Sequence, residues 1–185
     1  MRQNRYNCCQ VPMISALIPT LNSERHLVPV LSALVAGSAA GLLRDVIIAD
    51  GGSTDCTERI ADAAGCDFRR LPGNERERLM SAAASARGPW LLILGPASVL
   101  DESWTREVAK FVEGTHAGRA ASFRLAIDDY GFAPRLKEVL SAARNALTGR
   151  PKTGQGLLVP KALYRANGGK TGRVVFLRTR VILPA

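Results

Sequence analysis

Short apolar runs alternate with helix-forming segments through the first 113 residues, and this order constrains the fold more than any other feature. Runs such as "LLIL" at 91–94 are apolar at every position, which is typical of parallel strands that are buried on both faces. We predict strands at 14–20, 45–50, 66–71 and 90–94, with helices at 23–36, up to Gly65, at 75–87 and within 102–114. A strand-helix-strand order places its strands side by side in one sheet that helices wrap. The sequence therefore predicts an α/β protein with a mainly parallel sheet.

The pattern changes after residue 113. Strands are expected at 119–127, 156–160 and 173–183, and helices at 133–148 and 161–167. A chain of 185 residues favours a single domain, which we assign to residues 13–185. Residues 1–12 are polar and precede the first strand, so we expect a disordered leader there and take Met13 as a possible true start. No apolar stretch approaches the roughly 20 residues of a membrane-spanning helix.

Positive charge gathers in the last third of the chain. The net charge is +9, yet residues 1–116 hold 12 Lys or Arg against 13 Asp or Glu. Residues 117–185 hold 13 Lys or Arg against Asp128, Asp129 and Glu138. This asymmetry suits an anionic ligand or an acidic lipid surface, and a solvated basic face is the alternative. Nucleic acid is not expected, because the region has no binding motif and few aromatic residues.

Two turns at strand ends carry polar and small residues suited to a ligand. They are "IPTLNSE" at 18–24 and "ADGGSTD" at 49–55, and carboxyl ends of parallel strands form the ligand crevice of open α/β sheets. Asp50 can accept a hydrogen bond from a ribose hydroxyl or a base N–H, while Gly51 and Gly52 permit close approach of the backbone. The alternative is helix capping, by Ser23 at the first helix and by Ser53, Thr54 and Asp55 at the second, with Asp55 and Glu58 as a capping box.

Taken together and in this order, the motifs resemble the family 2 glycosyltransferases of the GT-A fold. The similarity rests on "ISALIPTLNSERHL", "VIIADGGSTDCTERIA" and "AASARGPWLLIL", and continues through "FRLAIDD", "GQGLLVPKALYRANGG" and "GRVVFLRTRVILPA". It covers nearly the whole chain after residue 12. The resemblance implies a Rossmann-like three-layer αβα sandwich, with a nucleotide-binding half at 13–113 and a truncated acceptor half at 114–185.

The resemblance also implies an activity and a set of nucleotide-binding residues. Family members transfer a sugar from a nucleotide diphosphate donor to an acceptor, with inversion at the anomeric carbon. A basic residue after the third strand often faces the nucleotide; "NERERL" offers Arg76, our candidate, or Arg78, although strict alignment puts Glu75 there. The positions in the two turns that correspond to the family's nucleotide-binding residues are Pro19, Thr20, Leu21, Asn22, Asp50, Gly51, Ser53 and Asp55.

Three acidic features of the family are missing. Its fourth strand ends in a D-x-D type motif that helps to hold Mn or Mg, and this chain has Gly95, Pro96 and Ala97 there. Glycine and alanine offer no side-chain oxygen to a hard cation, so no metal ligands are expected at that position. Gly154 replaces an aspartate before Gln155, and the acidic pair that follows "ANGG" is absent. Asp128 and Asp129 remain as candidate catalytic acids, or as part of a simple turn.

Two functions follow from these matches and losses. The first is a glycosyltransferase that binds a nucleotide sugar or nucleoside diphosphate and whose activity is altered or lost. The alternative is a catalytically inert GT-A domain that binds a nucleotide, a lipid phosphate or a partner protein. In either case residues 117–185 suit an anionic acceptor or a membrane surface. Four cysteines without CxxC spacing indicate reduced thiols, and we expect a cytoplasmic protein, either free in solution or peripheral to the inner face of the membrane.

Overall fold

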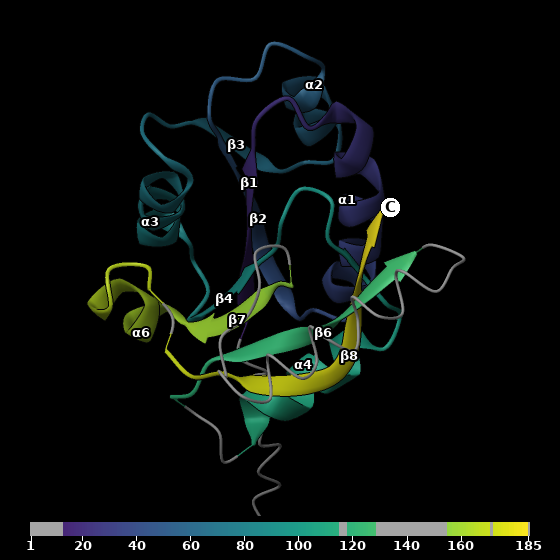
Figure 1. The fold of residues 1–185 in the computed structure, drawn as a ribbon, viewed down its shortest axis with the longest axis vertical. Coiled ribbons are helices and arrows are strands. Elements are labelled where there is room, and N and C mark those ends of the chain that lie inside the picture. The colour runs from purple at the N-terminus through teal and green to yellow at the C-terminus, as the bar shows by residue number, and fades with distance from the viewer. Residues whose placement is uncertain (1–12, 115–117, 129–154, 171, 185) are drawn as a thin grey trace, which may run out of the picture.

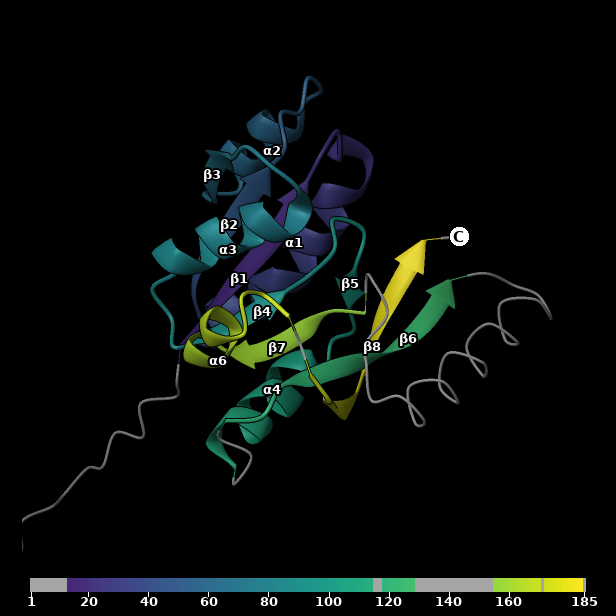
Figure 2. The ribbon, with the colours of Figure 1, turned by 60° about the vertical axis from the view of Figure 1, so that its left-hand side comes forward.

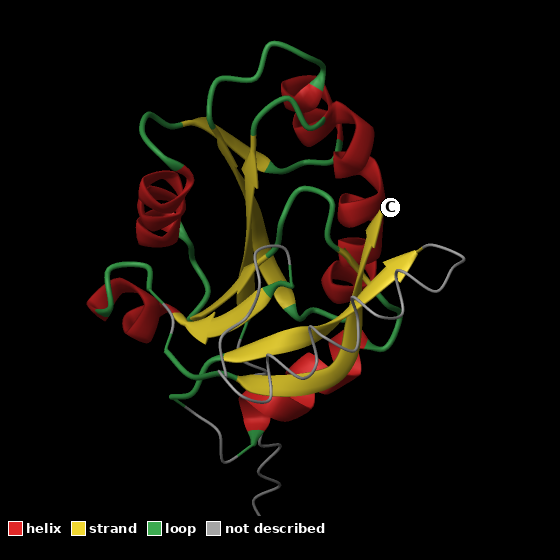
Figure 3. Ribbon diagram, in the orientation of Figure 1, coloured by secondary structure: helices red, strands yellow, loops and turns green. Residues whose placement is uncertain are grey.

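One curled sheet runs through the molecule, with helices on both sides (Figures 1 and 3). A computed structural model describes residues 13–114, 118–128, 155–170 and 172–184. The strand order in the described part is β3-β2-β1-β4-β7-β6-β8-β5. The strands are β1 (Ile14–Thr20), β2 (Leu43–Asp50), β3 (Asp67–Arg70), β4 (Trp90–Ile93), β5 (Val99–Leu100), β6 (Ala121–Asp128), β7 (Leu157–Pro160) and β8 (Val175–Pro184). The helices are α1 (Glu24–Ala39), α2 (Thr57–Ala63), α3 (Glu75–Ser85), α4 (Trp104–Glu113) and α6 (Lys161–Ala166).

The parallel part of the sheet is built around β1. Strands β2 and β4 pair with β1 in parallel on its two sides, and β3 pairs in parallel with β2. The carboxyl ends of these strands therefore meet at one edge of the sheet. Beyond β4 the strands β7, β6 and β8 continue the sheet, with β7 antiparallel to both β4 and β6. Four of the seven described pairings are parallel, so the prediction of a mainly parallel sheet is confirmed.

Alternate residues of β1 face two separate helical layers. Ile14, Ala16 and Ile18 belong to one apolar cluster with residues of α1 and α4. Leu17 belongs to a second cluster with residues of α3 and α6. Figure 2 shows α3 and α6 on the near side of the sheet, with α1 behind it. The three-layer αβα arrangement that the resemblance implied is therefore present.

Helix α1 is fixed against the sheet by an apolar stripe and by α4. Its buried residues Leu27, Val30 and Leu34 recur at helical spacing and face β1. Trp104 of α4 is fully buried, and its Nε1–H donates to the carbonyl oxygen of Ala33 at 2.9 Å. Because the indole ring lies directly against Gly37, any side chain at position 37 would collide with it. This contact sets the position of α1, whose amino end contributes to the site.

The structure departs from the sequence prediction at the two-residue strand β5, which was not expected. Val99 and Leu100 are too few residues to show a strand period, and they pair antiparallel with β8. The predicted helix at 133–148 and the predicted leader at 1–12 lie outside the described residues. Among the described helices, none has the length and apolar character needed to span a bilayer.

Candidate functional site

The turns that follow β1 and β2 are joined to each other by hydrogen bonds. The backbone N–H of Asn22 donates to Ser53 Oγ at 2.8 Å, and the N–H of Thr54 donates to Asn22 Oδ1 at 2.9 Å. The N–H of Ser23 donates to Thr57 Oγ1 at 2.9 Å. We call this set, residues 19–24 and 50–57, the joined turns. Sequence reasoning selected both turns from their composition, and the structure brings them together at the carboxyl edge of the parallel strands.

Asp50 holds the second turn in place. Its side chain is fully buried, and Oδ1 accepts hydrogen bonds from the hydroxyls of Thr20 (2.8 Å) and Ser53. Oδ2 accepts from the backbone N–H groups of Gly52 (2.8 Å) and Ser53 (2.7 Å). These four donors fill the acceptor capacity of a carboxylate. Asp50 is therefore a positioning residue here, and its oxygens are not turned towards solvent as the direct contact with a ribose or base would require.

The hydrogen bonds that Asp50 accepts lower its pKa by more than burial raises it. Burial by itself raises the pKa of the Asp50 carboxyl, but the hydrogen bonds from Ser53, Thr20 and Gly52 bring the pKa below its ordinary value. The group is therefore ionised at neutral pH. Gly52 adopts a φ of 102°, which a residue with a side chain rarely adopts, so this turn requires glycine at that position.

The helix caps differ from those predicted. Ser23 is the residue before α1, but its hydroxyl contacts the backbone of Leu21 and makes no capping bond to the helix. Instead, Asp55 Oδ2 accepts from the N–H of Glu24 at 3.1 Å, and Glu24 Oε2 accepts from the N–H of Cys56 at 2.9 Å. The amino ends of α1 and α2 thus cap each other. This reciprocal arrangement depends on the two turns being neighbours, which a local sequence pattern does not reveal.

The predicted capping box of Asp55 and Glu58 is wrong. Helix α2 begins at Thr57, one residue later than that box requires, and Glu58 instead forms an ion pair with Arg70 at 2.6 Å. Asp55 Oδ1 accepts from the backbone N–H and the hydroxyl of Thr57. Burial alone raises the pKa of Asp55, but these bonds and the one from Glu24 bring it below its ordinary value. Asp55 therefore acts on both turns at once.

Arg78 is the arginine that lies at the second turn. Its Nε donates to the carbonyl of Ala49 at 3.3 Å and one terminal nitrogen donates to the carbonyl of Gly73 at 3.0 Å. A methyl group added to Gly51 would lie 2.9 Å from the guanidinium carbon, so the cation rests against this glycine. Arg76, our candidate from the sequence, donates instead to the carbonyl of Gly168.

A few residues of the joined turns face solvent. Leu21 has 57% of its surface exposed, which is high for a large apolar side chain. Asn22, Gly51, Gly52 and Thr54 are also exposed, whereas Asp55 is half-buried. Pro19, Thr20, Asp50 and Ser53 are buried. The predicted residues therefore divide into a buried set that shapes the turns and an exposed set that a ligand can reach.

The end of β4 carries no metal ligands. Gly95, Pro96 and Ala97 follow the strand in a tight turn in which the N–H of Ser98 donates to the carbonyl of Gly95 at 3.1 Å. None of these three residues has a side-chain oxygen, nitrogen or sulfur. The described residues also contain no group of three or more His, Cys, Asp or Glu able to hold a metal ion. The donor set at this strand end therefore does not fit the Mn or Mg that the family resemblance implied.

Of the two candidate catalytic acids, the structure describes the backbone of Asp128 alone. Asp128 is the last residue of β6 and pairs in register with Pro184 of β8. Asp129 and Gly154 fall outside the described residues. The sequence reasoning missed the parts played by Glu24 and Thr57, whose only sequence signal is that each lies at a helix start beside a predicted turn.

A parallel β3-β2-β1-β4 core, with joined turns at its carboxyl edge and helices on both faces, defines a Rossmann-like domain of the GT-A class. The sequence matches the profile of glycosyl transferase family 2 over residues 15–177. The chain therefore belongs to glycosyl transferase family 2. No curated protein matches the chain in sequence.

Solved glycosyltransferase structures share the fold. TarS (residues 1–349) from S. aureus superimposes with a TM-score of 0.65 at 16% identity, covering 84% of this chain and 49% of that one. Glucosyl-3-phosphoglycerate synthase from M. tuberculosis gives a TM-score of 0.65 at 16% identity, covering 94% of this chain and 72% of that one. Another structure of that synthase contains Mn2+, UDP and glucosyl-3-phosphoglycerate and gives a TM-score of 0.61 at 19% identity, covering 94% of this chain and 71% of that one. The chain thus spans about half the length of the TarS structure.

Proposed function

We propose that this chain binds the nucleoside diphosphate part of a nucleotide-sugar donor at the joined turns, and does so without a divalent metal at the end of β4. The observation that carries the proposal is the mutual bonding of the β1 and β2 turns, which presents Leu21, Asn22 and Gly51 from a rigid base. Structures of the same fold are described with UDP-GlcNAc (TarS) and with UDP-glucose and Mn2+ (the synthase), which supports a nucleotide at this edge.

Each part of the turns has a separate role in this proposal. Leu21 supplies an exposed apolar surface for a base or ribose, and the backbone at Gly51 and Gly52 permits close approach. Asp50 and Asp55 keep the turns in shape and do not touch the ligand. Arg78 adds a positive charge beside Gly51 that favours a phosphorylated ligand.

Sugar transfer requires compensation of the negative charge that develops on the leaving diphosphate. A metal supplies this compensation in many transferases, but Gly95 and Ala97 offer no ligand for one. Arginine side chains are the groups of this chain that can take over part of that role. The same lack of ligands favours the alternative of an inert domain that binds the nucleotide without turnover. Hydrolysis of UDP-sugar or GDP-sugar in the presence and absence of manganese separates the two functions.

A basic surface of β6 and β8 supports an anionic acceptor or membrane surface. Arg124 lies directly beside Arg180 in the β6–β8 register, and Arg178 precedes Arg180 by two residues. All three side chains are exposed. Asp101 is the acidic neighbour among the described residues, and its Oδ2 accepts from the backbone N–H of Arg180 at 2.9 Å. Like charges that face each other across strands repel, so an anion bound here would relieve that repulsion.

Replacement of Arg178 and Arg180 by serine is expected to weaken binding to phosphatidylglycerol vesicles by about thirtyfold, since each of the two basic residues near an anionic surface contributes about 1 kcal/mol. Cosedimentation at low and physiological salt measures this. Arg59→Ser, an exposed arginine of α2, serves as the control. Equal binding of phosphatidylcholine vesicles would contradict an electrostatic surface, and a loss of binding to an anionic acceptor alone would assign these arginines to the acceptor.

The central test is a thermal-shift and calorimetric titration with UDP, GDP and their sugars, with and without manganese. A ligand that binds only the folded chain raises the midpoint in proportion to RT ln(1 + [L]/Kd), so binding is visible before the reaction is known. We expect at least one nucleoside diphosphate to bind, with the same affinity when manganese is removed. Arg78→Ala is expected to weaken that binding by about tenfold, because a charge-assisted contact to phosphate is lost.

Arg76→Ala is the matched control for Arg78→Ala. Both arginines lie near the start of α3. Arg76, however, donates to the carbonyl of Gly168 and not to the turn that follows β2. Nucleotide affinity is therefore expected to change little in this variant. An equal loss in both variants would argue for a general charge effect, and no binding of any nucleotide by the folded wild-type chain would overturn the proposed function.

A further inference from the structure

Helix α1 presents an apolar face to solvent. Val28 and Val35 have 52% and 63% of their surface exposed. They are separated by seven residues, about two helical turns, so they lie on the same side of the helix. Residues 27–43 contain no charged side chain. Because the solvent face of a surface helix normally carries charged residues, this face is typical of a helix that packs against a partner.

A groove of about 690 Å3 runs beside this helix. Its walls come from α1, the start of β2, the end of α2 and the start of β3. The apolar residues that line it include Val28, Leu31, Val35, Leu43, Val46 and Ile60. We call the exposed side of α1 together with this groove the α1 face. Within the α1 face, the exposed side chains of Val28 and Val35 form a ridge along one border of the groove.

The α1 face is separate from the joined turns. Strand β2 contributes Leu43 to Val46 at its amino end, and β3 contributes Asp67, its first residue. The joined turns follow the carboxyl ends of β1 and β2. The α1 face shares no residue with the joined turns, and it extends from Val28 and Ile60, about one helical turn beyond them, to the amino edge of the sheet.

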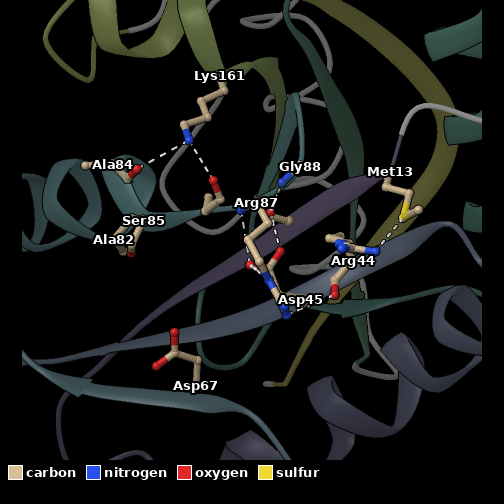
Figure 4. Close-up of polar contacts among 12 residues, drawn as sticks. Met13, Arg44, Asp45, Asp67, Ala82, Ala84, Ser85, Arg87, Gly88 and Lys161 are labelled. Atoms are coloured by element: carbon tan, nitrogen blue, oxygen red, sulfur yellow. Dashed lines mark hydrogen bonds and ion pairs between the residues drawn. The ribbon is translucent and has the colours of Figure 1, made fainter.

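The rim of the groove carries charges of both signs (Figure 4). Arg87 lies 3.3 Å from Asp45 in an ion pair, and Arg44 lies next to Asp45 in the sequence. Asp67 pairs with Arg69 at 2.6 Å. An apolar centre with a mixed polar rim is the usual composition of a protein interface. A surface with both signs can also meet a rotated copy of itself, whereas an anionic amphiphile would face the exposed carboxylate of Asp67.

The distribution of charge along the chain favours the same partner. Two copies with a net charge of +9 repel each other, but the excess lies in residues 117–185. Residues 1–116, which contain the α1 face, hold 12 Lys or Arg against 13 Asp or Glu. Contact through this nearly neutral part brings little like charge together, whereas a strongly acidic or basic partner finds no opposite net charge there.

We propose that the α1 face is the contact between two copies of this chain related by a two-fold axis. In such an interface the same surface is used on both subunits. The two α1 helices lie antiparallel, so that Val28 of one copy meets Val35 of the other. Ser32, an exposed residue that lines the groove midway between them, then lies close to the axis and to its own counterpart.

The first test compares the oligomeric state of charged variants. Wild-type protein is expected to be a dimer at about 100 μM in sedimentation velocity and light scattering. Val28→Glu with Val35→Glu is expected to raise the dimer dissociation constant by about a hundredfold, because two apolar contacts become buried charges. Ala36→Glu is the control, since Ala36 is exposed on the same helix but does not line the groove. Circular dichroism checks that each variant folds.

A cysteine cross-link tests the two-fold geometry. Ser32→Cys is made with Cys8, Cys9 and Cys56 replaced by serine. The remaining Cys66 lines the groove, and burial raises the pKa of its thiol to about 11, so little thiolate is present at neutral pH. The same background without Ser32→Cys measures any link that forms through Cys66. Mild oxidation is expected to link two copies through position 32, and the same background with Ala36→Cys is expected to link far fewer.

Three results would overturn the proposal. They are a monomeric wild-type chain at every concentration, a dimer that Val28→Glu with Val35→Glu leaves intact, and equal cross-linking through positions 32 and 36. A monomer that binds anilinonaphthalene sulfonate in a Val28-dependent manner would also overturn it and would assign the groove to a small amphiphile.

Discussion

Replacement of Asp50 by alanine is expected to lower the free energy of unfolding by about 3 kcal/mol, since buried donors that lose a charged acceptor cost 1–3 kcal/mol or more. The carboxylate accepts four hydrogen bonds, three from Gly52 and Ser53 of the second turn and one from Thr20 at the end of β1. Without it, the turn has no defined shape, and nucleotide binding is expected to disappear even in the fraction that stays folded. Denaturant unfolding and calorimetry measure the two effects.

Two control variants distinguish the effect of the Asp50 side-chain volume from the effect of its charge. Asp50→Asn keeps the volume but turns one acceptor oxygen into a donor that faces other donors, so it is expected to be nearly as destabilised as Asp50→Ala. Asp62→Ala removes an exposed carboxylate from α2 and is expected to change little. If Asp50→Asn retained full stability and bound nucleotide normally, the positioning role of Asp50 would be contradicted.

The pKa of Asp50 also predicts how stability depends on pH. Its pKa in the folded protein lies below its ordinary value, which describes the unfolded chain. The stabilisation from Asp50 is therefore complete above about pH 4, near the unfolded value, and is lost as the pH falls through the lower folded value. Asp55 and Asp101 have lowered pKa values as well, and they contribute in the same direction. Asp50→Ala is expected to lose its own part of this acid dependence.

Introduction of aspartates at Gly95 and Ala97 is expected to create manganese-dependent nucleotide binding. Strand β4 is parallel to β1, so its end lies at the same edge as the joined turns. Gly95 and Ala97 are half-buried, and Gly95 does not adopt a positive φ, so its backbone conformation is one that a residue with a side chain can adopt. Two carboxylates there offer the oxygen ligands that a hard cation needs against a diphosphate. Calorimetry is expected to show about tenfold tighter binding of a nucleoside diphosphate in the presence of Mn2+.

The matched control is Gly95→Asn with Ala97→Asn, which adds the same bulk without the charge. This variant is expected to bind nucleotide as the wild type does, with or without manganese. Addition of a chelator is expected to return the aspartate variant to wild-type affinity. Unchanged affinity in the folded aspartate variant would show that the end of β4 does not face the diphosphate.

The sequence was sufficient to predict the strands and helices of the first half, because buried parallel strands such as "LLIL" have a strong apolar signal. It also located both turns of the site. It did not distinguish Arg78 from Arg76, which are two residues apart and so point about 200° apart around α3. The start of α3 decides which arginine faces β2. That start is fixed by a capping box of Asn74 and Glu77, which sequence reasoning overlooked.

The caps of α1 and α2 escaped prediction for a different reason. Ser23 and Asp55 are good capping residues in a local sense, but the chain brings the two helix starts side by side. The N–H of Glu24 then donates to Asp55, while the Ser23 hydroxyl makes no capping bond, so tertiary contact overrides the local pattern. The end of β4, in contrast, could be predicted, because the sequence itself shows that Gly95 and Ala97 carry no carboxylate.

The reciprocal bonds between the β1 and β2 turns have a consequence for protein engineering. Asn22, Glu24, Ser53 and Asp55 each bond to the other turn, so neither turn has a shape of its own. A chimera that receives only one of them from a relative would carry mismatched donors and acceptors at the seam. Under the proposed function, donor specificity is therefore expected to transfer to another scaffold only when both turns are transplanted together.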